Sequence, residues 1–346
     1  MPSPPPIAAQ IYDELAATFE QTYTSSPDQA ATLQIGGCLV RLRATTPALH
    51  CQVLRPLACP LSTADQTPDF TVDLVDLGEH LLPDLPWLPQ NTSREQETSE
   101  YQEGPFLFTR HGDVLLTALN QETRRTVGLV QAPARWPLRH YKQAIFITLY
   151  QHLRRRGLHL IHASAIGQNG RAALIAGRSG AGKTTTMLTC VAAGLAFLGD
   201  DTTLLQRTPA GDIDVISLLS TLDVTDKTAA WFPEIAPFLS PLRSHTGKRQ
   251  IILSEAYPSR VAVRGQVSAI LAPEITDRVH TTLAPANKAS LLSDLLFYSV
   301  DLQDVALARQ HLEFLAQAVE QIPIYRLLLG SDRQQLPRVI TEILRA

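Results

Sequence analysis

Hydrophobic positions near the start of the chain recur at every fourth residue. Ile7, Ile11, Leu15 and Phe19 follow this step, which would place them on one face of a helix. The residues before them are rich in proline, and the stretch TSSPDQAA after them breaks the pattern. The sequence therefore predicts a loose tail and an amphipathic helix within residues 1–27.

Short alternating runs replace this pattern as far as about residue 130. Each run is bounded by Gly, Pro, Asp or Asn, which is typical of strands, and the runs read LQIGGCLVRLRA, DFTVDLVDL, FLFTRHG and DVLLTAL. The stretch LLPDLPWLPQNTSREQETSEYQEG is punctuated by proline and then polar, so it predicts a long exposed loop. We expect residues 28–130 to form a smaller α+β accessory domain without a recognisable catalytic motif.

A strong helix pattern follows the boundary APARWP. Apolar residues again step by four between Leu138 and Arg156, while Pro137 stands where a helix can begin and Gly157 where one can end. The run of arginines at its end suits the negative end of a helix dipole. We therefore expect a linker helix within residues 131–157.

The remaining residues, 158–346, alternate strands with helices. The runs LHLIHASAI and RAALIAG flank GQNG, in which Asn169 and Gly170 make a good hairpin turn. A helix over about 183–193 and the strand LAFLG follow, and QVSAILAP and IYRLLL predict further strands among the later helices. This order predicts an α/β domain.

Composition narrows the class of protein. With 45% hydrophobic residues, 18% charged residues and a formal net charge of −3, the chain resembles an ordinary globular protein and offers nucleic acid no electrostatic attraction. No apolar run approaches the ~20 residues of a membrane span, and the first residues lack a secretory pattern. The four cysteines show no metal-ligand spacing. We expect a cytoplasmic protein with no membrane span and no nucleic-acid partner.

The stretch GRSGAGKTT carries the clearest chemistry. Gly177, Gly182, Lys183 and Thr184 match the phosphate-loop pattern GxxxxGK[ST], and the loop lies between a predicted strand and a predicted helix, as such a motif requires. Backbone amides and the helix N-terminus would hold the phosphates of ATP, Lys183 would reach the β- and γ-phosphates, and the Thr184 hydroxyl would ligate Mg²⁺. An ordinary glycine-rich turn is the alternative. The candidate nucleotide-binding residues are Gly177, Arg178, Ser179, Gly180, Ala181, Gly182, Lys183, Thr184 and Thr185.

Two adjacent carboxylates follow the strand after the phosphate loop. Asp200 and Asp201 end the run FLGDD, and adjacent side chains at a strand end point in different directions. One carboxylate can therefore face a metal or nucleotide while the other orients a hydroxyl and accepts its proton, as a kinase requires. A solvent-exposed turn is the alternative.

His162, in the run HLIHASAI, is a third candidate. A single histidine on a strand is more often a packed or surface residue than a catalytic one, and His159 falls on the opposite strand face.

The order of these motifs carries a family resemblance. A strand histidine, GxSGxGK[ST] and a strand that ends in an aspartate pair resemble the C-terminal catalytic domain of HPr kinase/phosphorylase and of related bacterial kinases of peptide precursors and free serine. The resemblance implies a P-loop fold akin to phosphoenolpyruvate carboxykinase. It also implies that Lys183 binds phosphate, Thr184 and Asp200 hold Mg²⁺, Asp201 accepts the proton and His162 belongs to the active site.

The chain departs from that family at two places. Thr185 stands where HPr kinases usually carry an acidic residue, and STLDVTDKTAA, with Asp223 and Asp226, replaces their Glu-x-Arg-Gly stretch. Both departures weigh against HPr as the substrate and against phosphorolysis. Lys248 and Arg249 precede an apolar run, where they would either clamp phosphates or remain solvated, and Arg260 and Arg264 present the same choice.

Two functions follow from these residues. The first is an ATP-dependent kinase whose acceptor hydroxyl belongs to serine in a peptide or protein, or to a serine-like small molecule. The second is an ATP-driven switch or assembly protein without an acceptor. A transport ATPase is disfavoured because no LSGGQ-like stretch follows the loop. HPr kinases form rings, so the resemblance allows for a homo-oligomer.

Overall fold

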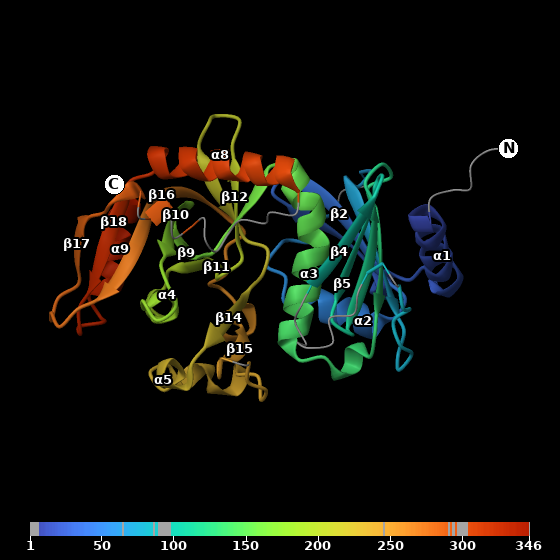
Figure 1. Cartoon of the computed structure of the whole chain (residues 1–346). Coiled ribbons are helices and arrows are strands. Elements are labelled where there is room, and N and C mark those ends of the chain that lie inside the picture. Colours follow the sequence, from blue (N-terminus) through green and yellow to red (C-terminus); the bar gives the residue numbers. More distant parts are fainter. Residues whose placement is uncertain are drawn as a thin grey trace. The chain divides into compact units, whose positions relative to one another are not determined.

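The chain folds into two compact units. The computed structural model describes residues 7–63, 66–85, 87–88, 98–244, 246–289, 291–292, 295 and 304–345. One unit comprises Met1–Pro56 and Pro60–His152, and the other comprises Leu57–Cys59 and Leu153–Ala346 (Figure 1). Each unit has its own mixed β-sheet and packed helices, so the protein is of the mixed α/β class.

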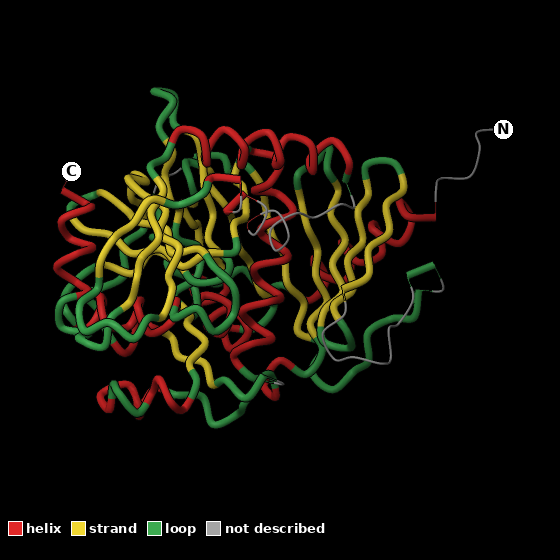
Figure 2. The backbone as a smooth tube through the Cα atoms, turned by 60° about the vertical axis from the view of Figure 1, so that its left-hand side comes forward, coloured by secondary structure: helices red, strands yellow, loops and turns green. Residues whose placement is uncertain are grey.

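The sheet of the first unit has strands that run side by side (Figure 2). Its pairs are antiparallel except where β3 joins β2 and β7 in parallel. Across the sheet the strands are β1 (Ala30–Ile35), β2 (Cys38–Ala44), β3 (Phe70–Asp76), β7 (Arg125–Val130), β6 (Leu115–Asn120), β5 (Phe106–His111) and β4 (Thr98–Glu103).

The α-helices in the described part of the first unit are α1 (Ile7–Thr22), α2 (Pro47–Leu54) and α3 (Leu138–Leu153). The amphipathic helix α1 is confirmed, although its buried face is formed by Ala8, Tyr12, Leu15 and Phe19 while Ile7 is exposed. The inward stripe therefore starts one residue later than the four-residue step predicts, because i+3 and i+4 spacings alternate along it. Helix α3 reaches the sheet through His152, which stacks on Phe70.

The predicted exposed loop before residue 104 is wrong in part. Thr98–Glu103 forms β4, and Leu82, Leu85 and Leu88 are buried in the core beneath α1. Strand β4 pairs only with β5, and its side chains are all partly or fully exposed. An edge strand of this kind lacks the apolar alternation on which sequence prediction depends. Residues 86 and 89–97 of the predicted loop lie outside the described residues.

The larger sheet belongs to the second unit. Its strands run in the order β11, β9, β10, β16, β13, β12 and β8, and β18 joins β16 to β17. Their bounds are β8 (Leu158–Ile161), β9 (Ala163–Gln168), β10 (Arg171–Ala176), β11 (Ala196–Gly199), β12 (Thr203–Arg207), β13 (Ile213–Ile216), β16 (Arg264–Ile275), β17 (Thr282–Pro285) and β18 (Ile324–Leu329).

Four strands of this sheet end at the same edge. Strands β10, β16 and β18 pair in parallel, and β11 runs in the same direction because both β10 and β11 pair antiparallel with β9. Strand β9 begins at this edge, where Ala163 lies opposite Ala176. We call this side of the sheet the P-loop edge. Residues that follow β10, β11, β16 and β18, or precede β9, are thereby brought together there.

Helices cover both faces of the larger sheet. Alternate residues of β10 point to opposite faces, with Ala173 and Ile175 in the core beneath α4 (Lys183–Ala192) and α9 (Leu336–Arg345). Leu174 belongs to the opposite core, which α8 (Val305–Gln321) covers (Figure 1). A two-stranded sheet of β14 (Thr221–Val224) and β15 (Arg249–Ile252), with α5 (Asp226–Ala229), the 3-10 helix η4 (Pro233–Phe238) and α6 (Leu253–Ala256), extends the first of these cores.

Several sequence predictions can be compared with this structure. The hairpin turn at Asn169 and Gly170 is confirmed, since Gln168 pairs with Arg171 across it. The single predicted strand LHLIHASAI is wrong, because the chain breaks at His162 into β8, which pairs with β12, and β9, which pairs with β10 and β11. Among the described residues no helix is long and apolar enough to cross a bilayer.

Candidate active site

The phosphate loop connects β10 to α4 at the P-loop edge. The chain leaves the strand at Ala176, turns through a bond from the Ala181 amide to the Arg178 carbonyl at 3.2 Å, and enters the helix at Lys183. Gly182 caps the helix in the left-handed region, with φ of +103°. A Cβ at this position would lie 2.8 Å from Leu329 Cδ1. Glycine is therefore favoured at Gly182 chiefly by its backbone angle, while the Leu329 side chain would have to shift to admit a Cβ.

Lys183 lies inside the curl of this loop. Its buried ammonium donates to the Gly177 carbonyl at 2.6 Å and lies 3.4 Å from the Arg178 carbonyl. The first turn of α4 holds no acidic residue, so the dipole and the free amides of the helix N-terminus are not neutralised by a side chain there. A fixed cation and unpaired amides at one point make an anion-binding site.

His162 and Asp201 meet beside the loop. His162 precedes β9 and Asp201 follows β11, and the His162 Nε2 atom lies 3.5 Å from Asp201 Oδ1. Both side chains retain access to solvent, with 30% and 26% exposed. Asp201 is itself in the left-handed region, with φ of +57°, which an aspartate adopts only at a modest energetic cost.

The pKa of His162 is lowered, chiefly by burial of the ring. The Asp201 carboxylate raises this pKa, whereas the positive charges of Lys183 and Lys248 lower it. The net effect favours a neutral imidazole at neutral pH.

Asp200 has different surroundings from Asp201. Its carboxylate is buried and accepts a hydrogen bond from the Ser164 hydroxyl, two residues beyond His162 on β9. The two carboxylates therefore separate as their positions at a strand end predict, one inward and one toward solvent. Sequence reasoning missed Ser164, although a serine within an otherwise apolar strand was a usable signal.

The other charged candidates have mainly structural partners. Arg249 begins β15 and, with Arg243, pairs with Asp226, at 3.5 Å and 2.7 Å respectively. Arg260 donates to the Gly194 carbonyl at 3.0 Å beyond the end of α4, and Arg264 pairs with Asp214. Lys248 is the member of this group whose positive charge lowers the pKa of His162.

The donors at this edge suit a magnesium ion that accompanies phosphates. Mg²⁺ in nucleotide sites takes one or two protein oxygens and completes its shell with phosphate and water. The hydroxyl of Thr184, in the first turn of α4, and the Asp200 carboxylate are such donors. No group of three or more His, Cys, Asp or Glu side chains suited to a metal occurs in the part of the chain that the structure describes.

The comparisons with known proteins include a distant structural likeness. No protein-family model matches the chain, and no curated protein matches it. Among solved structures, the HPr(Ser) kinase/phosphatase from Coxiella burnetii matches with a TM-score of 0.27 and 13% sequence identity, over 53% of this chain and 92% of that chain. The proposals below rest on this chain's own residues.

Proposed function

We propose that the protein is an ATP-dependent kinase. It transfers the γ-phosphoryl group to a hydroxyl, that of serine in a peptide or protein or of a serine-like small molecule. The observation that carries the proposal is the convergence of three features at the P-loop edge. These are the loop with its buried Lys183, the partly exposed carboxylate of Asp201, and the buried carboxylate of Asp200.

The loop would hold the triphosphate. Its amides and the first turn of α4 would face the phosphates, and no acidic side chain in that turn competes with them. Lys183 would exchange its bonds to the Gly177 and Arg178 carbonyls for bonds to the β- and γ-phosphates. Charge that develops on the transferred group is then stabilised by donors already in position, which is where most of the rate of phosphoryl transfer originates. Magnesium, held by Thr184 and Asp200, would supply further neutralisation of the phosphates.

Asp201 would act on the acceptor. The acceptor oxygen forms a bond to the γ-phosphorus as the bond from that phosphorus to the bridging oxygen breaks, ADP departs, and the hydroxyl proton passes to the Asp201 carboxylate. The solvent access of Asp201 would let an acceptor reach it from outside. His162 would be a positioning residue that holds this carboxylate in its left-handed turn.

A search for the acceptor tests this proposal. The protein would be incubated with γ-labelled ATP, Mg²⁺ and an extract of its own source, in parallel with Asp201→Asn and with Asp113→Asn, an exposed aspartate of the first unit that serves as the control. We expect label on a peptide, protein or serine-like metabolite with the wild type and the control, and a loss of about 10²–10⁴-fold with Asp201→Asn. Label found only as free phosphate, equally in all three samples, would instead support the switch without an acceptor.

A further inference from the structure

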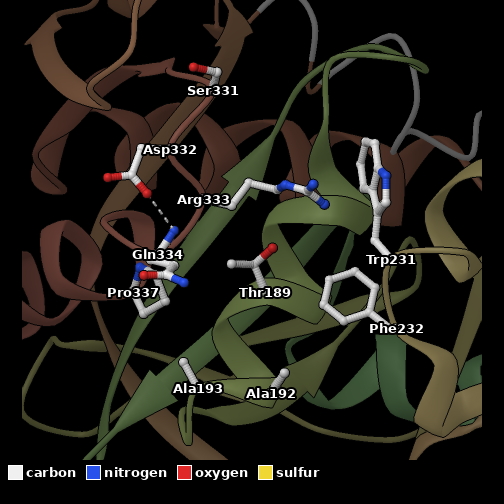
Figure 3. Close-up of a pocket in the computed structure, with 10 residues that line it drawn as sticks. All are labelled: Thr189, Ala192, Ala193, Trp231, Phe232, Ser331, Asp332, Arg333, Gln334 and Pro337. Carbon is white, nitrogen blue, oxygen red and sulfur yellow. Dashed lines mark hydrogen bonds between the residues drawn. The ribbon is translucent and has the colours of Figure 1, made fainter.

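Two hollows adjoin on the side of the P-loop where β16 and β18 end. The first, which we call the side pocket, has a volume of about 350 Å³ and is lined by residues that include Gly182, Thr185, Trp231, Ile275, Leu329 and Arg333. The second, the outer groove, has a volume of about 680 Å³ and runs along α4 past Thr189 and Ala193 (Figure 3). Both are bordered by Trp231 and Arg333, which mark the boundary between them.

The side pocket and the catalytic candidates lie on opposite sides of the loop. Strand β10, which carries the loop, has β9 and β11 on one side and β16 and β18 on the other. His162 and Asp201 belong to the first side, whereas Ile275 and Leu329 belong to the second. A triphosphate with its γ-phosphate toward Asp201 therefore directs its nucleoside end toward the side pocket.

The wall of the side pocket extends beyond the loop-bearing strand. The last paired residue of β10 on this side, Ile175, lies opposite Leu271, yet β16 continues to Ile275 and remains paired with β18 as far as Leu329. Ile275 is exposed despite its apolar side chain. These two strand ends thus present an apolar surface beside Gly182, where an added Cβ would lie 2.8 Å from Leu329 Cδ1 and 3.8 Å from Ile275 Cγ1.

Trp231 and Arg333 contact each other at the border of the side pocket. The Arg333 guanidinium carbon lies 3.9 Å from the centre of the Trp231 ring, and Figure 3 shows Arg333 directed toward the indole. Trp231 is 41% exposed. A guanidinium stacked on an exposed indole offers a planar surface and donors at its edge, which suit a planar ring that carries acceptor atoms.

Two buried hydroxyls of the pocket have hydrogen-bonding capacity left. Thr186 is 1% exposed, and its hydroxyl has no hydrogen-bond partner among the described residues. The Thr281 hydroxyl accepts from the Gly330 amide at 3.1 Å, so its proton remains available to donate. Unpaired buried hydroxyls are costly, and a ligand with polar atoms at its rim would satisfy them.

We propose that the side pocket binds the nucleoside end of a purine nucleotide. The purine ring packs against Ile275 and Leu329, and its acceptor edge faces Arg333, which Trp231 holds in place. This inference rests on the proposed function, because it takes the triphosphate to be held by the loop. It adds that recognition of the base comes from the last residues of β16 and β18, from Arg333 and from the segment after α5, rather than from the loop itself.

Tryptophan fluorescence tests the position of the base. The chain has three tryptophans, and Trp231 is the one in the second unit, so wild type and Trp231→Phe would be titrated with Mg·ATP and with Mg·tripolyphosphate. We expect ATP to change the emission of the wild type, because the base contacts Arg333, which lies on the Trp231 ring, and we expect the change to vanish in Trp231→Phe. Tripolyphosphate, which lacks a base, should compete with ATP for the loop without producing the change.

Affinity measurements separate the base from the phosphates. Arg333→Ala should weaken ATP binding about tenfold, the size of one exposed cation–π or charged hydrogen-bond contact, and should leave tripolyphosphate affinity within about twofold. The exposed Arg278, outside the pocket lining, serves as the matched control, and Arg278→Ala should leave both affinities unchanged.

The outcomes distinguish the two proposals. Equal loss of ATP and tripolyphosphate affinity in Arg333→Ala would overturn the base assignment, since Arg333 would then contact phosphate. Wild-type ATP affinity in Arg333→Ala, with phosphoryl transfer intact, would overturn it while leaving the kinase standing. Failure of the wild-type protein to bind ATP at all would overturn both.

Discussion

Replacement of Gly182 by alanine probes the geometry on which the anion site depends. The new Cβ would lie 2.8 Å from Leu329 Cδ1, and the backbone at this position has φ of +103°. Gly180, in the same loop, has φ of +86° but nothing within 4 Å of the corresponding Cβ. The pair of substitutions therefore separates backbone strain from a clash between the loop and β18.

The two contributions have different sizes. Left-handed backbone costs a non-glycine residue about 1–2 kcal/mol, and this cost applies to both Gly180→Ala and Gly182→Ala. Displacement of the Leu329 side chain, which is flexible, partly exposed and borders the side pocket, adds about 0.5–1.5 kcal/mol, and this applies to Gly182→Ala alone. We expect the free energy of unfolding to fall by about 1–2 kcal/mol for Gly180→Ala and by about 1.5–3.5 kcal/mol for Gly182→Ala.

A double-mutant cycle with Leu329→Ala identifies the clash. Urea unfolding monitored by circular dichroism would be measured for Gly182→Ala, Leu329→Ala and the double variant, and the same set would be made with Gly180→Ala. Removal of Cδ1 should relieve the clash, so the Gly182 cycle should show a coupling of about 0.5–1.5 kcal/mol and the Gly180 cycle less than about 0.5 kcal/mol. Equal stability of the two glycine variants, or no coupling at either position, would refute this description of the loop.

Two further predictions concern stability away from the loop. His159 stacks on Phe314 beside His311, and burial, then the charges of His311 and Arg207, lower its pKa to about 4. Because the unfolded chain binds the proton with a pKa of about 6.5, this contribution to stability should be complete above that pH and fall by about 2–3 kcal/mol as the pH drops to 4. Urea midpoints at several pH values should show a smaller fall in His159→Gln. Asp73 is fully buried and accepts from Arg43 Nε at 2.7 Å and Arg125 Nε at 2.6 Å. Asp73→Asn should therefore lower the free energy of unfolding by about 3–5 kcal/mol. Asp113, at the surface and 3.8 Å from Arg110, is the control, and Asp113→Asn should lower it by less than about 0.5 kcal/mol. Equal costs for the two aspartates would contradict the buried ion-pair assignment.

Local sequence signals predicted the parts of the fold that local interactions determine. The phosphate loop, the Asn169–Gly170 hairpin and the helices that begin near Leu138 and Lys183 all have residues whose backbone preferences act within one turn. Strand β4 was missed because its pattern is polar, and the break at His162 because it depends on which strands β8 and β9 pair with.

The candidate site shows the same division. The residues of the loop are consecutive in the sequence, and so are Asp200 and Asp201, so both motifs can be recognised without the fold. The side pocket cannot be recognised from the sequence, because Trp231, Ile275 and Arg333 come from three segments far apart in the chain that only the folded structure brings together. Ser164 beside Asp200 is an intermediate case, since a polar residue in an apolar strand marks a position without naming its partner.

The separation of binding from transfer tests the central claim most directly. Nucleotide affinity by calorimetry and phosphoryl transfer to the identified acceptor would be measured for Lys183→Met and Asp201→Asn. We predict that Lys183→Met loses at least about tenfold in ATP affinity together with transfer, whereas Asp201→Asn binds ATP within about twofold of wild type and loses transfer by about 10²-fold or more. Transfer at the wild-type rate by Asp201→Asn would contradict the account.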